Sequence, residues 1–198
     1  VKAYPKEVAV LLSVELCSLT LQLQNLSIPN LISSGLFGDG AAAVVMVGKG
    51  RRALGPRVVA TRSVFYPDSE RVMGWDISER GFQVVLSAEV PEVVRRHLRR
   101  DVDEFLQDHG IDRGQIVSWV AHPGGPKVLT ALEEALELEP DALQLTRESL
   151  ERVGNLSSTS VLLVLEETMR SRRPEPGSLG MMLAMGPGFC SELVLLEW

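Results

Sequence analysis

Apolar residues along the chain form short continuous runs that are typical of strands and spaced stripes that are typical of helices. Runs rich in Val, Leu and Met predict strands over 7–15, 36–47, 57–66, 82–86, 116–121, 179–185 and 189–196. The first two runs are almost uninterrupted, which predicts strands that are buried on both faces. Residues 16–34 show no clear period, and we expect irregular structure there. Residues 67–79 are expected to form a loop or a short element.

Other segments carry apolar residues at helical spacing. A helix is predicted to start at Pro91, a residue favoured in the first turn, and to stop at Gly110. Further helices are predicted over 127–138, 140–153 and 157–169, the last capped by Ser157 or Ser158. Strands that alternate with helices, followed by two adjacent strands, indicate a layered α/β domain. The buried stripe of the first predicted helix is Val94, Leu98, Val102 and Phe105.

Composition narrows the class of protein. The chain has 198 residues, 45% of them hydrophobic and 23% charged, which is ordinary for a globular domain. A net charge of −6 and the lack of a basic stripe argue against a nucleic-acid partner. The basic residues at 95, 96, 99 and 100 are followed by acidic ones, so this segment is interpreted as a solvated helix face.

Location and extent can also be predicted. No apolar run reaches the roughly 20 residues of a membrane span, and no signal peptide is recognisable. Two cysteines, Cys17 and Cys190, do not make a disulfide framework, so a cytoplasmic protein is expected. The chain starts at Val1 in what looks like the end of a helix, and we expect it to be part of a longer polypeptide.

Two tight turns carry the candidate chemistry. The apolar run 117–121 ends in His122, and Pro123, Gly124 and Gly125 then turn the backbone into the next helix. Asn155 occupies a second turn before the helix predicted over 157–169. Taken singly, His122 fits a structural histidine equally well, and Asn155 fits a left-handed turn residue better than a catalytic one. Together they offer two donors to a carbonyl oxygen that gains negative charge.

Four segments in this order resemble one family: LFGDGAAA (36–43), AHPGGP (121–126), VGNLSS (153–158) and AMGPGF (184–189). The chain resembles the chalcone and stilbene synthase family, the type III polyketide synthases, over essentially all its residues. It matches about the second half of a family member. The resemblance implies a thiolase-like fold layered α-β-α-β-α, in which residues 1–48 end the N-terminal half and residues 49–198 form the C-terminal half. It also implies a homodimer.

The resemblance implies an acyltransferase that extends an acyl-CoA starter with malonyl-CoA and cyclises the product to a pyrone or phenol. CoA thioesters are its substrates, and no further cofactor is implied. His122 and Asn155 match the family's catalytic histidine and asparagine. The nucleophilic cysteine is expected before Val1, so residues 1–198 alone are expected to be inactive. Cys17 lacks a helix start that would lower its pKa, and Cys190 lies within a predicted strand, so neither is expected to replace it.

The remaining site residues also come from the resemblance. Phe37 matches the phenylalanine that gates the CoA tunnel, although a plain core role fits it too. Val84 stands where the family has a second gating phenylalanine, and Trp75 where many members have glycine, which suggests an altered acyl channel, such as one for a fatty starter in a bacterial-type enzyme. The segment beside the pantetheine arm of CoA is Gly124, Gly125 and Lys127. The implied lining of the substrate cavity is Cys17, Thr20, Phe37, Trp75, Val84, Ser157, Met185, Gly186, Pro187 and Gly188.

Other interpretations of the sequence stay open. Ketoacyl-carrier-protein synthases of the third kind share the fold, the histidine and the asparagine, but they usually continue the histidine with Gln-Ala-Asn, whereas Pro-Gly-Gly-Pro follows His122. A catalytically silent fragment or a CoA-binding module is a further alternative. Asp39 is interpreted as a turn residue and Glu15 as a structural hydrogen-bonding group. No residues have metal-ligand spacing, and segment 36–43 lacks the GK[ST] ending of a phosphate loop.

Overall fold

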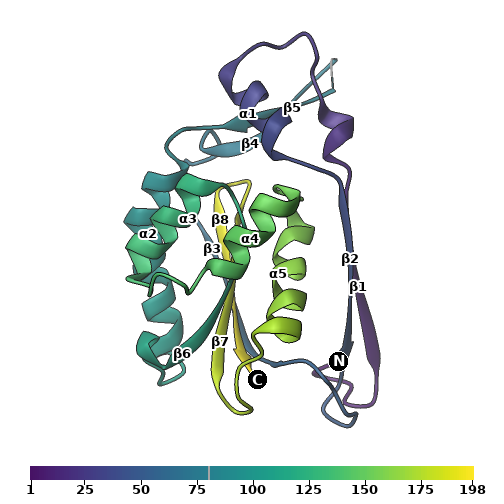
Figure 1. The fold of residues 1–198 in the computed structure, drawn as a ribbon, viewed down its shortest axis with the longest axis vertical. Coiled ribbons are helices and arrows are strands. Elements are labelled where there is room, and N and C mark those ends of the chain that lie inside the picture. Colours follow the sequence, from purple (N-terminus) through teal and green to yellow (C-terminus); the bar gives the residue numbers. More distant parts are fainter. Residues whose placement is uncertain (80) are drawn as a thin grey trace.

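The computed structural model describes residues 1–79 and 81–198, which form a layered α/β structure (Figure 1). The first half of the chain contains β1 (Val8–Glu15), the 3₁₀ helix η1 (Cys17–Thr20), α1 (Ile28–Leu36), β2 (Gly40–Val47), β3 (Arg57–Phe65), β4 (Met73–Ser78) and β5 (Gly81–Leu86). The second half contains α2 (Val90–Gln107), the 3₁₀ helix η2 (Arg113–Gln115), β6 (Ile116–Ala121), α3 (Pro126–Leu136), α4 (Gln144–Val153), α5 (Ser158–Ser171), β7 (Leu179–Gly186) and β8 (Cys190–Glu197).

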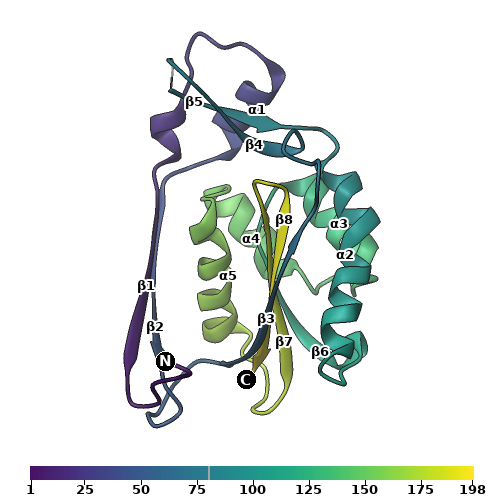
Figure 2. The ribbon, with the colours of Figure 1, turned by 180° about the vertical axis from the view of Figure 1, so that it is seen from behind.

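A central sheet with strand order β3-β8-β7-β6 organises these elements. β6 runs parallel to β7, and the other two pairings are antiparallel. Helices α2 and α3 cover one face of this sheet and α5 lies against the other, as the front and back views show (Figures 1 and 2). The antiparallel pair β1–β2 packs on the far side of α5. The layers therefore run helix, sheet, helix, strand pair, which are four of the five layers expected.

Alternation along the strands divides the core between the two faces of the sheet. Met181 and Leu183 of β7 join the main cluster with Leu193 and Leu195 of β8, against α2 and α3. Met182 points the other way and packs in the cluster of Val120, Val161 and Val164, which lies against α5. The predicted stripe of α2 is confirmed: Val94, Leu98, Val102 and Phe105 are each 0% exposed.

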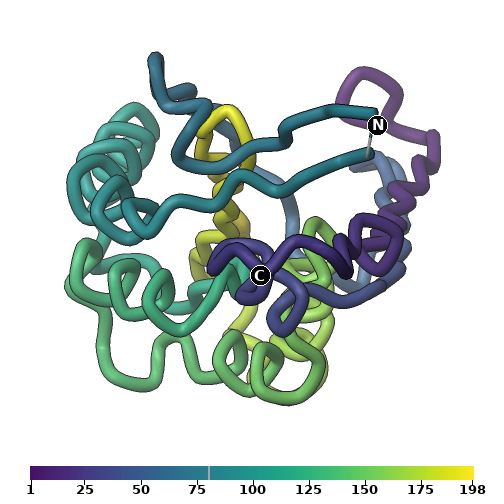
Figure 3. Tube along the Cα trace, turned by 90° about the horizontal axis from the view of Figure 1, so that it is seen from above, coloured from purple at the N-terminus to yellow at the C-terminus, as the bar shows by residue number. Residues whose placement is uncertain are grey.

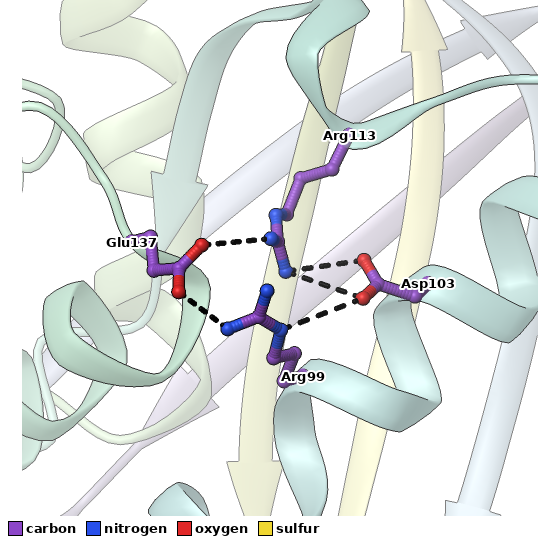
Figure 4. A network of polar contacts seen from close by, with 4 residues as sticks. All are labelled: Arg99, Asp103, Arg113 and Glu137. Atoms are coloured by element: carbon purple, nitrogen blue, oxygen red, sulfur yellow. Dashed lines mark hydrogen bonds and ion pairs between the residues drawn. The ribbon is translucent and has the colours of Figure 1, made fainter.

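Ion pairs join the outer edges of α2 and α3 (Figure 4). Arg99 of α2 lies 2.6 Å from Glu137, which follows α3. Arg113 bridges Asp103 of α2, at 3.1 Å, and the same Glu137, at 3.4 Å. Arg95, Arg96 and Arg100 also pair with neighbouring acidic side chains. The arginines of this helix thus meet carboxylates on the protein itself, as the solvated-face interpretation expects.

Three expectations about the elements were wrong. β1 is not buried on both faces: Leu12 is 71% exposed and Val14 64%, because the described chain covers the β1–β2 pair only on the side of α5. Residues 28–36 form helix α1 with a proline in its first turn, where no regular element was predicted. Residues 1–7 form no helix, although the end of one was expected there. The short element expected within 67–79 is strand β4, which pairs with β5 as a hairpin.

Within residues 1–79 and 81–198, no helix is long and apolar enough to cross a bilayer. The same residues contain no cluster of three or more His, Cys, Asp or Glu side chains arranged to hold a metal ion.

Candidate active site

His122 lies immediately after β6, where the backbone leaves the sheet. Its N–H donates to the Leu183 carbonyl oxygen at 2.9 Å, and its own carbonyl oxygen accepts the Gly124 N–H at 2.9 Å. Gly125 follows at φ 144°, a backbone conformation that L residues rarely adopt, and α3 begins at the next residue. Main-chain bonds on both sides therefore fix the backbone that carries the imidazole.

Asn155 lies in the turn between α4 and α5 and is only 2% exposed. Its Oδ1 accepts the Ser157 N–H at 2.8 Å, which fixes the plane of the amide. Its Nδ2 forms no hydrogen bond within the described residues, so a strong donor remains available at the site. The preceding Gly154 has φ 74°, and a Cβ there would lie 2.7 Å from the Leu36 carbonyl oxygen, so the turn requires glycine.

The two turns meet at the end of α1. The Asn155 N–H donates to the Leu36 carbonyl oxygen at 2.8 Å, and the Gly38 N–H donates to the Asn155 carbonyl oxygen at 3.0 Å. The Leu36 side chain also lies 3.8 Å from the position that a Cβ would take on Gly125, three residues after His122. The histidine turn and the asparagine turn therefore flank the same residue, although each follows a different strand or helix.

Glu15 connects the β1–β2 pair to this site. Its Oε1 accepts the Ser158 N–H at 3.2 Å and also accepts from the Ser158 hydroxyl. The first turn of α5 is thus capped by a carboxylate from β1, and not by the Ser157 side chain, which makes no capping bond. The structural role expected of Glu15 is confirmed, and the expected cap from the helix's own serines is wrong.

Burial lowers the pKa of His122 to about 4, although the nearby Glu15 carboxylate acts in the opposite direction. The imidazole is therefore neutral at physiological pH, with one nitrogen as a donor and the other as an acceptor.

Neither cysteine has the properties of a nucleophile. Burial, followed by the charges of Glu15 and Asp39, raises the pKa of the Cys17 thiol. Burial and the charge of Glu192 raise the pKa of Cys190. Both thiols are held in the protonated form, which does not attack thioesters. Asp39 accepts hydrogen bonds from the Ser18 hydroxyl at 2.6 Å and the Ser18 N–H at 2.7 Å, so its carboxylate joins the start of β2 to η1.

The segment expected to shape the cavity connects β7 to β8. Met185 and Gly186 end β7, and the turn itself comprises residues 187–189. Its Gly188 N–H donates to the Met73 carbonyl oxygen at 3.2 Å, and Phe189 beyond it is 0% exposed. The turn is therefore attached to the base of the β4–β5 hairpin.

The β4–β5 hairpin carries Trp75 and Val84, the two positions expected to alter the acyl channel. Trp75 and Val84 are cross-strand partners, and the Trp75 ring contacts the Phe82 ring edge-on at 6.0 Å. The Gln22 side chain donates to the Phe82 carbonyl oxygen at 3.2 Å, which links the hairpin to the segment after η1. Viewed from above, the hairpin passes over the β7–β8 end and extends toward that segment (Figure 3).

The remaining predicted site residues lie on or next to η1, α1 and α3. Cys17 and Thr20 belong to η1, where the Thr20 hydroxyl donates to the Cys17 carbonyl oxygen at 2.8 Å. Phe37 follows α1 and forms a bridge with Asn155. A hollow of about 680 Å³ is lined by residues 21–26 and Gln83, the neighbours of Thr20 and Val84. Lys127 is exposed in the first turn of α3. The cavity and CoA roles of these residues stay predictions.

Sequence reasoning missed the contribution of Leu36, whose backbone carbonyl and side chain contact both turns. No residue type marks such a role, because a main-chain acceptor is available at any position. The helix that ends at Leu36 was also missed, so its contact with Asn155 was not predicted.

The chain matches the family model described as chalcone and stilbene synthases, C-terminal domain, over residues 57–197. It is 56% identical over 198 residues to a 1,3,6,8-tetrahydroxynaphthalene synthase of Streptomyces peucetius, covering 98% of this chain and 52% of that protein. It is 37% identical to a putative chalcone synthase of Bacillus subtilis, covering 100% of this chain and 56% of that protein. The chain thus spans about half the length of the curated relatives it matches.

Solved structures agree with this match. The crystal structure of 1,3,6,8-tetrahydroxynaphthalene synthase from Streptomyces coelicolor superimposes with a TM-score of 0.93 and 33% identity, over 99% of this chain and 56% of that one. A polyketide synthase from the brown alga Ectocarpus siliculosus gives a TM-score of 0.90 at 25% identity, over 98% and 54% of the two chains. The chain therefore belongs to the chalcone and stilbene synthase family, the type III polyketide synthases, and has the thiolase-like α/β fold of the C-terminal half of these enzymes.

Proposed function

We propose that residues 1–198 are the C-terminal part of a type III polyketide synthase that condenses malonyl-CoA onto an acyl-CoA starter and cyclises the product. In this proposal residues 1–48 complete the N-terminal half, residues 49–198 form the C-terminal half, and the working enzyme is a homodimer. The nucleophilic cysteine lies before Val1. The raised pKa values of Cys17 and Cys190 support a nucleophile outside these residues.

One observation carries the proposal: two neutral donors lie in turns that share Leu36 as a neighbour. The burial that lowers the pKa of His122 keeps it uncharged, and the Ser157 N–H fixes the Asn155 amide with its Nδ2 available. Directed donors of this kind stabilise a carbonyl oxygen that becomes an oxyanion. Asparagine suits the role because it donates at every pH, whereas a carboxylate would repel the developing charge.

The chemistry follows from this pair. When the malonyl thioester loses carbon dioxide, the electrons of the broken C–C bond move into an enolate whose oxygen accepts hydrogen bonds from His122 and Asn155. The enolate carbon then attacks the acyl group held on the cysteine, forming the new C–C bond and expelling the thiolate. The same imidazole stabilises that thiolate, which is the form that accepts the next acyl group.

The product class is proposed from the relatives. The 56% identity to a 1,3,6,8-tetrahydroxynaphthalene synthase favours a phenolic product built from malonyl units. The segment Gly124, Gly125 and Lys127 is proposed to lie beside the pantetheine arm of CoA, where the exposed ammonium of Lys127 can approach a phosphate. The cavity wall is proposed to comprise Cys17, Thr20, Phe37, Trp75, Val84, Ser157 and the segment Met185–Gly188.

The test offers malonyl-CoA and malonyl-carrier protein separately to the longer polypeptide and measures carbon dioxide release and product formation. We expect turnover with malonyl-CoA. Use of the carrier-protein form alone would instead identify a ketoacyl-carrier-protein synthase. Residues 1–198 alone should release no condensation product. Turnover by this polypeptide that disappears in Cys17→Ala would show that the nucleophile has been misassigned.

A further inference from the structure

The turn 187–189 is held by a serine that the proposed mechanism does not use. Ser69 lies between β3 and β4 and is 8% exposed. Its Oγ accepts the Phe189 N–H at 2.8 Å and donates its own proton to the Tyr66 carbonyl oxygen. A single hydroxyl thus satisfies one buried main-chain donor and one buried main-chain acceptor, which would otherwise be left unpaired.

Two main-chain bonds run beside this hydroxyl. The Tyr66 N–H donates to the Phe189 carbonyl oxygen at 3.0 Å, and the Gly188 N–H donates to the Met73 carbonyl oxygen at 3.2 Å. Both partners belong to the segment that leads into the β4–β5 hairpin. Within the described residues, the turn 187–189 and the base of the hairpin are therefore joined by three hydrogen bonds, of which only the one that Ser69 Oγ accepts involves a side chain.

The segment on the hairpin side is itself firmly fixed. The Tyr66 hydroxyl donates to Asp101 Oδ2 of α2 at 2.6 Å and lies 3.2 Å from the Ser191 hydroxyl of β8. Burial and this hydrogen bond raise the pKa of the Tyr66 phenol, so it stays protonated. The Tyr66 ring lies 6.0 Å from the Phe189 ring, in a cluster that Met185, Met73 and Leu86 also contact.

We propose that Ser69 is a positioning residue that couples the turn 187–189 to the β4–β5 hairpin and so fixes the separation of two walls of the acyl cavity. This inference rests on the proposed function, in which Met185–Gly188 form one wall and Trp75 and Val84 the other. Because the hydroxyl contacts only main-chain atoms of the turn, it sets where the wall stands without contacting the substrate.

Ser178 provides a matched control. Its hydroxyl donates to the carbonyl oxygen three residues earlier, that of Glu175 at 2.6 Å, as the Ser69 hydroxyl donates to Tyr66. Ser178 lies just before β7, at the opposite end of that strand from the turn, and its hydroxyl bonds no distant main-chain group in the described chain.

The first measurement is hydrogen exchange of the Phe189 amide in the longer polypeptide. Ser69→Ala should speed this exchange roughly tenfold, because one buried hydrogen bond is lost, whereas Ser178→Ala should leave it unchanged. Ser69→Thr, which keeps a hydroxyl, should restore protection. Unchanged protection of Phe189 in Ser69→Ala would overturn the coupling. If Ser69→Ala does not fold, Ser69→Cys, a similar side chain with a weak donor, replaces it in the same comparison.

The second measurement is the ratio of released products that contain different numbers of malonyl units. Ser69→Ala should change this ratio roughly fivefold, while Ser69→Thr and Ser178→Ala keep the wild-type ratio. If Ser69→Ala lowers total turnover but leaves the product ratio unchanged, Ser69 has only a structural role and the proposal is rejected. Failure of the wild-type protein to consume malonyl-CoA would reject the proposed function, while the exchange of Phe189 would still test the coupling.

Discussion

The central sheet with its helices and the β1–β2 pair with the β4–β5 hairpin differ sharply in packing. In the first region the four residues of the α2 stripe are each 0% exposed. In the second, Leu12 of β1 is 71% exposed and Ile77 of β4 is 74% exposed. His122 follows a strand of the central sheet and Asn155 is 2% exposed beside α5, whereas Trp75 is 46% exposed on the hairpin.

Under the proposed function, the packed region positions the catalytic side chains and the exposed hairpin selects the acyl chain. Side chains that must hold a developing oxyanion need fixed geometry, which rigid, packed elements provide. Trp75 and Val84, which the proposed function assigns to the choice of acyl chain, lie on the exposed hairpin, where substitutions disturb the core little. Under the proposed function, substitutions at Trp75 and Val84 are expected to change the product while His122 and Asn155 stay in place.

The largest expected effect tests the packed side of the comparison. Asn155→Ala in the longer polypeptide should lower kcat for malonyl-CoA condensation by about 10²–10³-fold, the usual loss for one oxyanion donor. Asn25→Ala is the control, because the Asn25 Oδ1 accepts the Ser27 N–H at 3.0 Å in the same kind of turn. Equal activity of the two variants would assign Asn155 to turn formation alone.

The difference in packing is tested by replacing one buried and one exposed leucine. Leu132→Ala should lower the free energy of unfolding by about 2–5 kcal/mol, because the side chain is 2% exposed and leaves a cavity. Leu12→Ala should change the same quantity in residues 1–198 by less than about 0.5 kcal/mol. Urea denaturation of both variants provides the measurement. A similar loss at both positions would contradict the packing difference.

The depressed pKa of His122 makes stability depend on pH in one direction. The unfolded chain takes up this proton near pH 6.5 and the folded chain only near pH 4, so stability is lost as the pH falls between these values. His122→Gln should remove this dependence, about 3 kcal/mol, from the difference in unfolding free energy between pH 7 and pH 4. Urea denaturation at pH 7 and pH 4 measures the unfolding free energy of the wild-type protein and of His122→Gln. If both proteins lose the same free energy between these pH values, the imidazole is not buried in its neutral form.

The smallest effect compares ion pairs in the two regions. Arg113, whose side chain is 18% exposed, bridges Asp103 and Glu137, so Arg113→Ala should cost about 1 kcal/mol of unfolding free energy. Arg71 pairs with Asp76 at the hairpin, but its side chain is 74% exposed, and Arg71→Ala should have no measurable effect. Thermal unfolding distinguishes them, and a larger shift for Arg71→Ala would reverse the comparison.

Periodicity predicted the packed region better than the exposed one. The buried stripe of α2 was predicted correctly because a helix that is covered on one side carries apolar residues at every third or fourth position. β1 has an equally apolar sequence, yet a run of Val and Leu does not say which other segment covers it. β4 was predicted only as a short element because Gly74 and Asp76 interrupt its pattern. α1 was missed because Pro29 interrupts its pattern, although a proline in the first turn is compatible with a helix.

The candidate site was predicted in its turns but not in its contacts. Proline and glycine mark the turns after His122 and before Asn155, and these residues were recognised. The meeting of both turns at Leu36, and the capping of α5 by Glu15, depend on main-chain groups and on segments far apart in sequence. Neither leaves a local signal.

The bridge between Phe37 and Asn155 has a consequence for how this region can vary. It consists of the Asn155 N–H bonded to the Leu36 carbonyl oxygen and the Gly38 N–H bonded to the Asn155 carbonyl oxygen. Because only peptide groups form this bridge, it does not depend on the side chain at position 37. During divergence, the aromatic ring at position 37 can therefore be replaced by a smaller or larger side chain while Asn155 keeps its position.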